Sequence, residues 1–282
     1  MIKFGVAGNS NSFYAEGNTA TTQAALWCKN RGIDVFEYSF GRGINVGDKG
    51  CEDLKKAFSD AGVELTVHAP YYINFSNPDP EMIGKSILYV LNSLKKVTVM
   101  GGDRVVVHPA TQGKAERKEA VDIAIRNLNL LANEVVNFNG QNMKVCLETM
   151  GKIAQIGDAE ETAEFCAIAP FFYPCIDFGH LNARTFGSLK TTDDYLNVFD
   201  AFLNKLPFEK VKNTHIHFSK IMYGNKGEIK HLTFEDTVYG PEFEPLCEAI
   251  LKLGLEPYII CESDGTQAED TVTMKNIYLS RI

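Results

Sequence analysis

The stretch Tyr173-Pro174-Cys175-Ile176-Asp177-Phe178-Gly179-His180 sets a carboxylate at the end of a short apolar run and an imidazole three residues later. Residues 174–176 predict a buried strand, and Gly179 predicts a sharp turn after it. We therefore expect Asp177 to end the strand and His180 to lie in the loop that follows. One D-x-x-H pattern alone is a weak signal, because either residue is often an ordinary surface or capping group.

The same arrangement recurs along the chain. Short apolar runs end in a residue type that binds metal ions at six places, which are His68, His108, Glu148, Asp177, His217 and Glu262. Successive members lie 40, 40, 29, 40 and 45 residues apart, and helical patterns occupy the intervals, as at residues 81–100 and 116–136. Chance does not readily produce this spacing, which suits one strand and one helix per interval.

This alternation predicts the fold. Two earlier strand-like runs, at residues 2–7 and 34–38, bring the number of strand-then-helix units to eight. Alternating strands and helices predict a parallel sheet of the α/β class, and eight units predict closure into a (β/α)8 TIM barrel. No linker of disordered composition interrupts the pattern, so we expect a single domain over residues 1–282. The carboxyl ends of barrel strands share the face where active sites lie, so the six residues are expected to converge.

Composition indicates a globular protein and narrows its partners. Hydrophobic residues make up 45% of the chain and charged residues 23%. The seven cysteines form no C-x-x-C pair, so we expect buried thiols in a reducing cytoplasm rather than disulfides. No apolar stretch is long enough to cross a bilayer, so no membrane partner is expected. The formal net charge of −8 argues against bulk attraction to nucleic acid but leaves room for a local basic groove.

The residue types at the six strand ends indicate a metal site. Imidazole and carboxylate ligands without thiolate suit zinc, manganese or iron. Six such residues exceed the ligands of one tetrahedral ion, which predicts more than one ion per chain. Glu148, on a middle strand, is best placed to bridge two of them. His215 lies two residues before His217 on the same strand, and we expect it to pack inside the barrel rather than bind metal.

Several motifs around these residues resemble the endonuclease IV family, also called type 2 apurinic/apyrimidinic endonucleases, among the xylose-isomerase-like barrels. The resemblance covers essentially the whole chain, and its most specific pieces are His68-Ala-Pro-Tyr-Tyr-Ile-Asn74, Val107-His-Pro109, Leu147-Glu-Thr149, Cys175-Ile-Asp-Phe-Gly-His180 and His217-Phe-Ser219. Archaeal-type members resemble it most, through Glu148-Thr-Met-Gly-Lys152 and Gly227-Glu-Ile-Lys-His231. The resemblance implies cleavage of damaged double-stranded DNA 5′ to abasic sites, in base excision repair. We expect the protein to be a monomer.

The resemblance also implies a cluster of two or three zinc ions. In the family arrangement the first ion is held by His68 and His108, the second by Asp177, His217 and Glu262 with Glu148 bridging the two, and the third by His180 and His231. The family has an aspartate two residues before the last histidine, where this chain has Ile229, and the adjacent Glu228 is expected to point another way on a strand. Glu228 is the one carboxylate that could take the place of the aspartate, and the third ion is the member of the cluster that depends on it. Glu148 is the expected catalytic residue, and Tyr71 and Arg42 are the expected DNA contacts.

Two other functions stay open at this point. A metal-dependent sugar isomerase or epimerase on the same barrel shares Glu148, Asp177, His180, His217 and Glu262, so these five residues do not separate it from a nuclease. His68, His108 and His231 favour a hydrolase, since an isomerase with one ion has no need of three more imidazoles. The other alternative is a DNA-binding relative whose turnover is weakened by Ile229.

Overall fold

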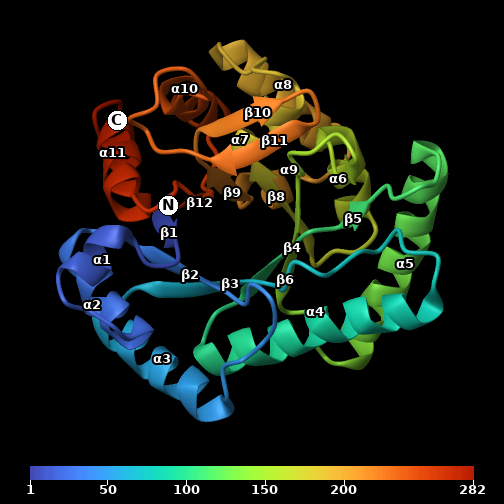
Figure 1. Ribbon diagram of the computed structural model, residues 1–282, viewed down its shortest axis with the longest axis horizontal. Helices are drawn as coiled ribbons and strands as arrows, with labels where there is room; N and C mark the ends of the chain where they lie inside the picture. The colour runs from blue at the N-terminus through green and yellow to red at the C-terminus, as the bar shows by residue number, and fades with distance from the viewer.

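Eight parallel strands close into a barrel at the centre of the molecule (Figure 1). The computed structural model describes residues 1–282. Going round the barrel, the strands are β1 (Lys3–Ala7), β2 (Val35–Ser39), β3 (Glu64–His68), β4 (Arg104–Val107), β6 (Lys144–Glu148), β8 (Phe172–Asp177), β9 (His215–Phe218) and β12 (Tyr258–Cys261), which pairs with β1. The predicted (β/α)8 barrel is confirmed.

Helices join successive strands, and most of them lie around the outside of this barrel (Figure 1). They are α1 (Asn11–Ala15), α2 (Thr21–Asn30), α3 (Asp48–Ala61), α4 (Pro80–Met100), α5 (Arg117–Asn137), α6 (Ala159–Ala167), α7 (Phe178–Arg184), α8 (Thr192–Leu203), α9 (Phe208–Lys212), α10 (Phe243–Leu253) and α11 (Gln267–Leu279). Gly101 ends α4 in the left-handed conformation, with φ of 82°, and Asp158 caps α6 in a capping box with Glu161.

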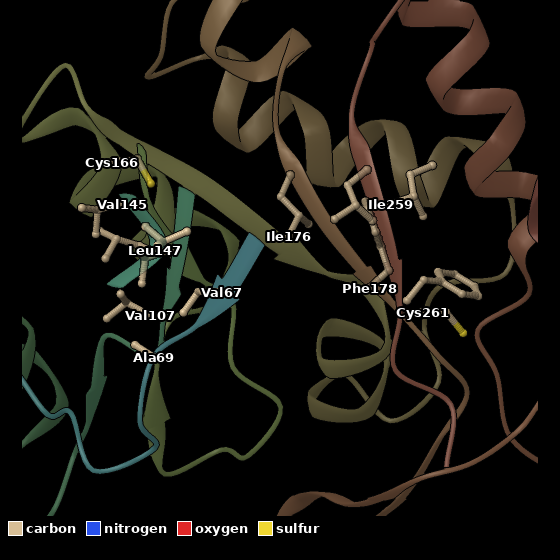
Figure 2. Packing of buried hydrophobic residues seen from close by; sticks show 14 of the residues in the cluster. Val67, Ala69, Val107, Val145, Leu147, Cys166, Ile176, Phe178, Ile259 and Cys261 are labelled. Atoms are coloured by element: carbon tan, nitrogen blue, oxygen red, sulfur yellow. The ribbon is translucent and has the colours of Figure 1, made fainter. Parts of the chain in front are cut away.

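Side chains alternate along each barrel strand between the surrounding helices and the barrel interior. In β6, Val145 and Leu147 belong to the large hydrophobic core, whereas Cys146 packs in a small separate cluster inside the barrel. Figure 2 shows Val145 and Leu147 beside Val67 and Val107 of neighbouring strands. The six strand-end residues singled out in the sequence all fall on the inward-facing positions, and this shared parity brings them together at one mouth of the barrel.

All seven cysteines are free and buried, as small interior residues are expected to be. Burial raises the pKa of the Cys146 thiol to about 12, so this group stays neutral at pH 7. None of the helices combines the length and the hydropathy needed to span a bilayer.

The segment after β8 is a helix, and the prediction of a loop around His180 is wrong. Asp177 accepts a hydrogen bond from the backbone N–H of His180 at 2.7 Å and so caps α7, into which β8 runs directly. Gly179 makes no turn and lies inside α7. Its small size matters for a different reason, since a Cβ at this position would lie 2.6 Å from the carbonyl oxygen of Ser219.

Residues 219–237, which follow β9, contain an antiparallel hairpin. Its strands are β10 (Ile221–Gly224) and β11 (Gly227–His231). Gly227, the first residue of β11 after the turn, adopts the left-handed conformation with φ of 86°. Lysines and glycines interrupt the apolar alternation of these strands, so the usual strand signal is absent from the sequence. A second small sheet pairs β5 (Ala110–Thr111) with β7 (Gln155–Ile156).

Candidate metal centre

Nine imidazole and carboxylate side chains gather at the carboxyl ends of the barrel strands, in three groups whose potential ligand atoms lie within 4.8 Å of one another. The two inner groups share one residue and consist of His68, His108 and Glu148, and of Glu148, Asp177, His217 and Glu262. The outer group consists of His180, Glu228 and His231. The eight residues expected from the sequence as ligands all lie in these groups, and Glu228 joins them.

Glu148 connects the two inner groups. Its Oε2 lies 3.2 Å from Nε2 of His68 and 3.0 Å from Nε2 of His108, while its Oε1 lies 3.1 Å from Nδ1 of His217. Burial alone would raise the pKa of this carboxyl, but the neighbouring His108 and His217 hold it well below the usual value. Glu148 is therefore an ionised carboxylate with one oxygen facing each inner group.

The second inner group contains a buried carboxylate oxygen without a hydrogen-bonding partner. Asp177 is fully buried, and its Oδ2 lies 3.2 Å from Nδ1 of His180 without forming a hydrogen bond. Burial raises the pKa of Asp177 to about 6. At Glu262 burial is outweighed by His217 and His231, which lower the pKa to about 2. Because an unpartnered buried carboxylate is costly, these oxygens and imidazoles fit a divalent cation.

The outer group depends on an irregularity in the hairpin. In the register of β10 and β11, Met222 is opposite Lys230 and Tyr223 is opposite Glu228, so Ile229 is the extra residue of a β-bulge. The bulge puts Glu228 and His231 on the same side although they lie three residues apart. Ile229 is 57% exposed, and Glu228 supplies the carboxylate. The expectation that Glu228 would point away is wrong, because it assumed a regular strand.

Hydrogen bonds orient the two imidazoles of the outer group. Nδ1 of His180 lies 3.0 Å from the carbonyl oxygen of Thr149, which leaves Nε2 facing Glu228 Oε2 at 3.5 Å. Nδ1 of His231 pairs with the hydroxyl of Ser219 at 2.8 Å. Burial would lower the pKa of His180, but Asp177, Glu148 and Glu228 raise it well above the usual value. A divalent ion in this group would replace the proton that the three carboxylates attract.

Tyr71 and Arg42 were expected to contact DNA. Tyr71 lies on the rim of the cavity, and Arg42 lies in the loop after β2. The Tyr71 ring stacks on His108 with 5.5 Å between ring centroids and an interplanar angle of 29°, and it remains 52% exposed. Its backbone N–H donates to the carbonyl oxygen of Gly41 at 3.1 Å, which ties it to the loop after β2. Arg42 is the next residue in that loop and is exposed to solvent.

Glu37 is a buried acid that sequence analysis did not select. It lies on β2, is 1% exposed, and its two oxygens approach His217 Nε2 at 2.9 Å and His215 Nε2 at 3.0 Å. His215 packs inside the barrel, as expected, and is fully buried. One feature of the sequence could have revealed Glu37. It is the single acidic residue within the strand-like run Val35-Phe-Glu-Tyr-Ser39, and a charged side chain that points into a barrel needs a partner there.

Seven of the nine residues, all but the fully buried Asp177 and His217, line a cavity of about 330 Å³, to which Tyr71, Lys152 and Gln155 also contribute. A neighbouring space of about 210 Å³ reaches Glu37 and Gln267. A larger groove, of about 620 Å³, lies outside the barrel between α4 and α5, and Arg126 is its one charged lining residue. That groove offers no cluster for metal or acid–base chemistry. The mouth is the candidate site because the nine ligand-type residues gather there.

Comparison with known proteins assigns the family. Residues 25–277 match the model of the xylose isomerase-like TIM barrel family. The chain belongs to this family. An uncharacterised protein of Methanocaldococcus jannaschii is 26% identical over 275 residues, which cover 98% of this chain and 96% of that protein. A probable endonuclease 4 of Bacillus subtilis is 27% identical over 205 residues, and the match spans 68% of this chain and 66% of that protein's length.

Solved structures resemble this xylose isomerase-like barrel over its full length. A D-tagatose 3-epimerase-like protein superposes with a TM-score of 0.69 at 19% identity, covering 99% of this chain and 98% of that one. Endonuclease IV from Thermus thermophilus gives a TM-score of 0.67, also at 19% identity, with coverage of 99% and 98%. At such identities the likeness shows the fold, and near-equal scores do not separate an epimerase from an endonuclease.

Proposed function

We propose that this xylose isomerase-like barrel is a metal-dependent phosphodiesterase of the endonuclease IV type, which cleaves DNA on the 5′ side of abasic sites. The observation that supports this proposal most is the presence of three ligand groups at one mouth. One ion for sugar chemistry would need only one such group. The partial sequence match to probable endonuclease 4 proteins supports the same choice.

The inner groups would hold two ions and the outer group a third. Their imidazole and carboxylate donors suit zinc, with manganese or iron as the other metals of matching preference. Such ions supply positive charge that makes a water acidic and balances the charge on phosphate oxygens. With Glu228 in the outer group, all three sites have both imidazole and carboxylate donors.

The side chains of the chain itself have distinct roles in the proposed reaction. Glu148 places one carboxylate oxygen in each inner group and can accept the proton of the attacking water. Water adds to the phosphorus atom and the bond from phosphorus to the 3′-oxygen breaks. The leaving 3′-oxygen takes up a proton from solvent, so the products are a 3′-hydroxyl and a 5′-phosphate on the abasic sugar. Tyr71 offers an exposed ring face at the rim, where it can lie against the damaged nucleotide. Lys152 borders the cavity and can contact a phosphate.

A nicking assay tests the proposed reaction. The substrate is an end-labelled duplex with one abasic site, and the control is the same duplex with an intact base at that position. We expect cleavage of the abasic duplex alone, with a 3′-hydroxyl product, and loss of activity after chelation. Affinity should fall as salt rises, with a slope of about −0.9 per neutralised phosphate. Binding without any nicking would instead support a DNA-binding relative that has lost turnover.

A sugar epimerase is the second candidate. The observation in its favour is that Glu148, Asp177, His217 and Glu262 form one complete group by themselves, which is enough for a single ion. The fold likeness to a D-tagatose 3-epimerase-like protein is a reason to assay the same metal-loaded protein for sugar epimerisation. Interconversion of ketoses by the loaded protein, together with an uncut abasic duplex, would overturn the nuclease proposal.

A further inference from the structure

Glu37 lies directly beneath the inner groups, inside the barrel. One of its oxygens, Oε1, is 2.9 Å from Nε2 of His217. The other, Oε2, is 3.0 Å from Nε2 of His215 and accepts a hydrogen bond from the hydroxyl of Thr66 at 2.8 Å. Glu37 belongs to none of the three ligand groups. A fully buried carboxylate that is not itself a ligand needs another reason to be there.

The His217 ring lies between Glu37 and the inner groups. Its Nδ1 faces Glu148 Oε1 at 3.1 Å and Glu262 Oε2 at 3.4 Å, whereas its Nε2 faces Glu37. A neutral imidazole has one N–H and one lone pair, and a metal ion takes the lone pair. If Nδ1 binds an ion among these carboxylates, the hydrogen of His217 must be on Nε2.

Glu37 is the carboxylate that faces that hydrogen, and the neighbouring Cys175 thiol stays neutral because burial raises its pKa well above the usual value. His217 is fully buried, and its Nε2 has no hydrogen bond to any other group. Glu37 Oε1 likewise has no hydrogen-bonding partner. The two atoms lie 2.9 Å apart, and a small rotation of either side chain would align the N–H with the oxygen. Without Glu37, the N–H of a metal-binding His217 would be buried and unsatisfied.

We propose that Glu37 is a positioning residue: it holds the hydrogen of His217 on Nε2 and so directs the Nδ1 lone pair toward a divalent ion in the inner group. This inference rests on the metal centre of the proposed function and not on its substrate, since an epimerase would need the same tautomer. Glu37 acts through His217 and does not touch the reacting atoms.

The tautomer of His217 can be read directly in the wild-type chain. Protein labelled with 15N at histidine and loaded with Zn²⁺ is examined by long-range 1H–15N correlation, and a His217→Asn variant assigns the signals. We expect hydrogen on Nε2 of His217 and a metal-shifted Nδ1 without hydrogen. Hydrogen on Nδ1 would overturn the proposal, and this measurement needs no Glu37 variant to fold.

Matched variants then measure what Glu37 contributes. Glu37→Met keeps the approximate size but removes the acceptor, and we expect Zn²⁺ affinity at the His217 site to fall by about 10–100-fold. Glu37→Gln retains one acceptor oxygen and should recover most of that loss. Thr66→Val is the control, because it removes another hydrogen bond to the same carboxylate without touching His217. Unchanged Zn²⁺ affinity and unchanged His217 signals in Glu37→Met would also overturn the proposal.

These readouts separate the inference from the proposed function. A wild-type protein that binds Zn²⁺ with the expected tautomer but leaves an abasic duplex uncut would support the role of Glu37 and reject the nuclease. A protein that nicks the duplex while His217 has its hydrogen on Nδ1 would support the nuclease and reject the role of Glu37.

Discussion

The inner and outer groups of the candidate metal centre use the same kinds of ligand but are built in different ways. The inner residues lie at or next to the ends of barrel strands, and Glu148, Asp177 and His217 are at most 1% exposed. The outer residues lie on α7 and on β11, and Glu228 and His231 are only half-buried. The closed barrel fixes the inner groups, whereas the outer group depends on the register of one hairpin. Variants can test whether the two parts are independent.

Glu148→Gln should have the largest effect, because one carboxylate is shared by both inner groups. We expect both inner ions to be lost together while the outer ion stays. The nicking rate should fall by more than about 100-fold, because loss of a residue that only supports a metal ligand already lowers metal affinity or activity by about 10–100-fold. Elemental analysis and single-turnover nicking measure the two effects. Glu160→Gln, which removes an exposed carboxylate on α6, is the control, and loss of a single ion in Glu148→Gln would contradict the bridging arrangement.

Glu228→Ala should affect the outer group alone. We expect one ion per chain to be lost, the inner ions to be kept, and nicking to fall by about 10–100-fold. Ile229→Asp is the informative companion, because the exposed Ile229 side chain is the bulged residue and lies outside the group. It should neither add an ion nor speed the reaction. A gain of activity in Ile229→Asp would show that the hairpin register in solution differs from the one described above.

Tyr71→Ala should have a smaller effect on binding. The ring stacks on His108 and stays half exposed at the rim. Its loss should weaken the affinity for an abasic duplex by about fivefold, which corresponds to the lower end of the stacking energy between a base and an aromatic side chain. Ion content should not change. Tyr72→Ala provides the control, since Tyr72 is similarly exposed but does not line the cavity. Equal losses in both variants would mean that Tyr71 has no special contact with DNA.

The opposite end of the barrel provides a purely structural charge cluster for comparison. Burial would raise the pKa of Asp103, but Arg104 and Lys144 lower it to about 2. A depressed pKa stabilises the fold above the unfolded value near 3.8, and this contribution is lost as pH falls toward 2. The Asp103 side chain is 48% exposed, so solvent screens its ion pairs. We therefore take only about half of the stabilisation that the pKa shift would give a buried group.

Asp103→Asn should therefore lower the free energy of unfolding by about 1 kcal/mol at pH 7. The difference from wild type should vanish near pH 2, and ion content should be unchanged. Denaturant unfolding at several pH values measures the effect on metal-free protein. A difference that grows on acidification would mean that the sign of the Asp103 shift is wrong.

The barrel and the inner ligands could be predicted from the sequence because both follow regular periods. Strand parity alternates every two residues, so His68, Glu148 and Asp177 had to share a face once their strands closed into a barrel. The capping role of Asp177 was missed, because a carboxylate at a strand end looks the same whether a loop or a helix follows. Glu228 was misjudged because a bulge breaks the period that the sequence argument assumes.

The sequence alone determined the eight-unit alternation, the barrel it implies and the residue types at its mouth, because hydrophobic periodicity is a local property of the chain. Tertiary structure decided what depends on register and on distant partners. The bulge at Ile229 brings Glu228 to His180, and the closure of the barrel brings Glu37 to His217, which lies 180 residues away in the chain. The partner of a buried carboxylate depends on which strands lie next to its own strand in the barrel. A local sequence pattern does not contain this information.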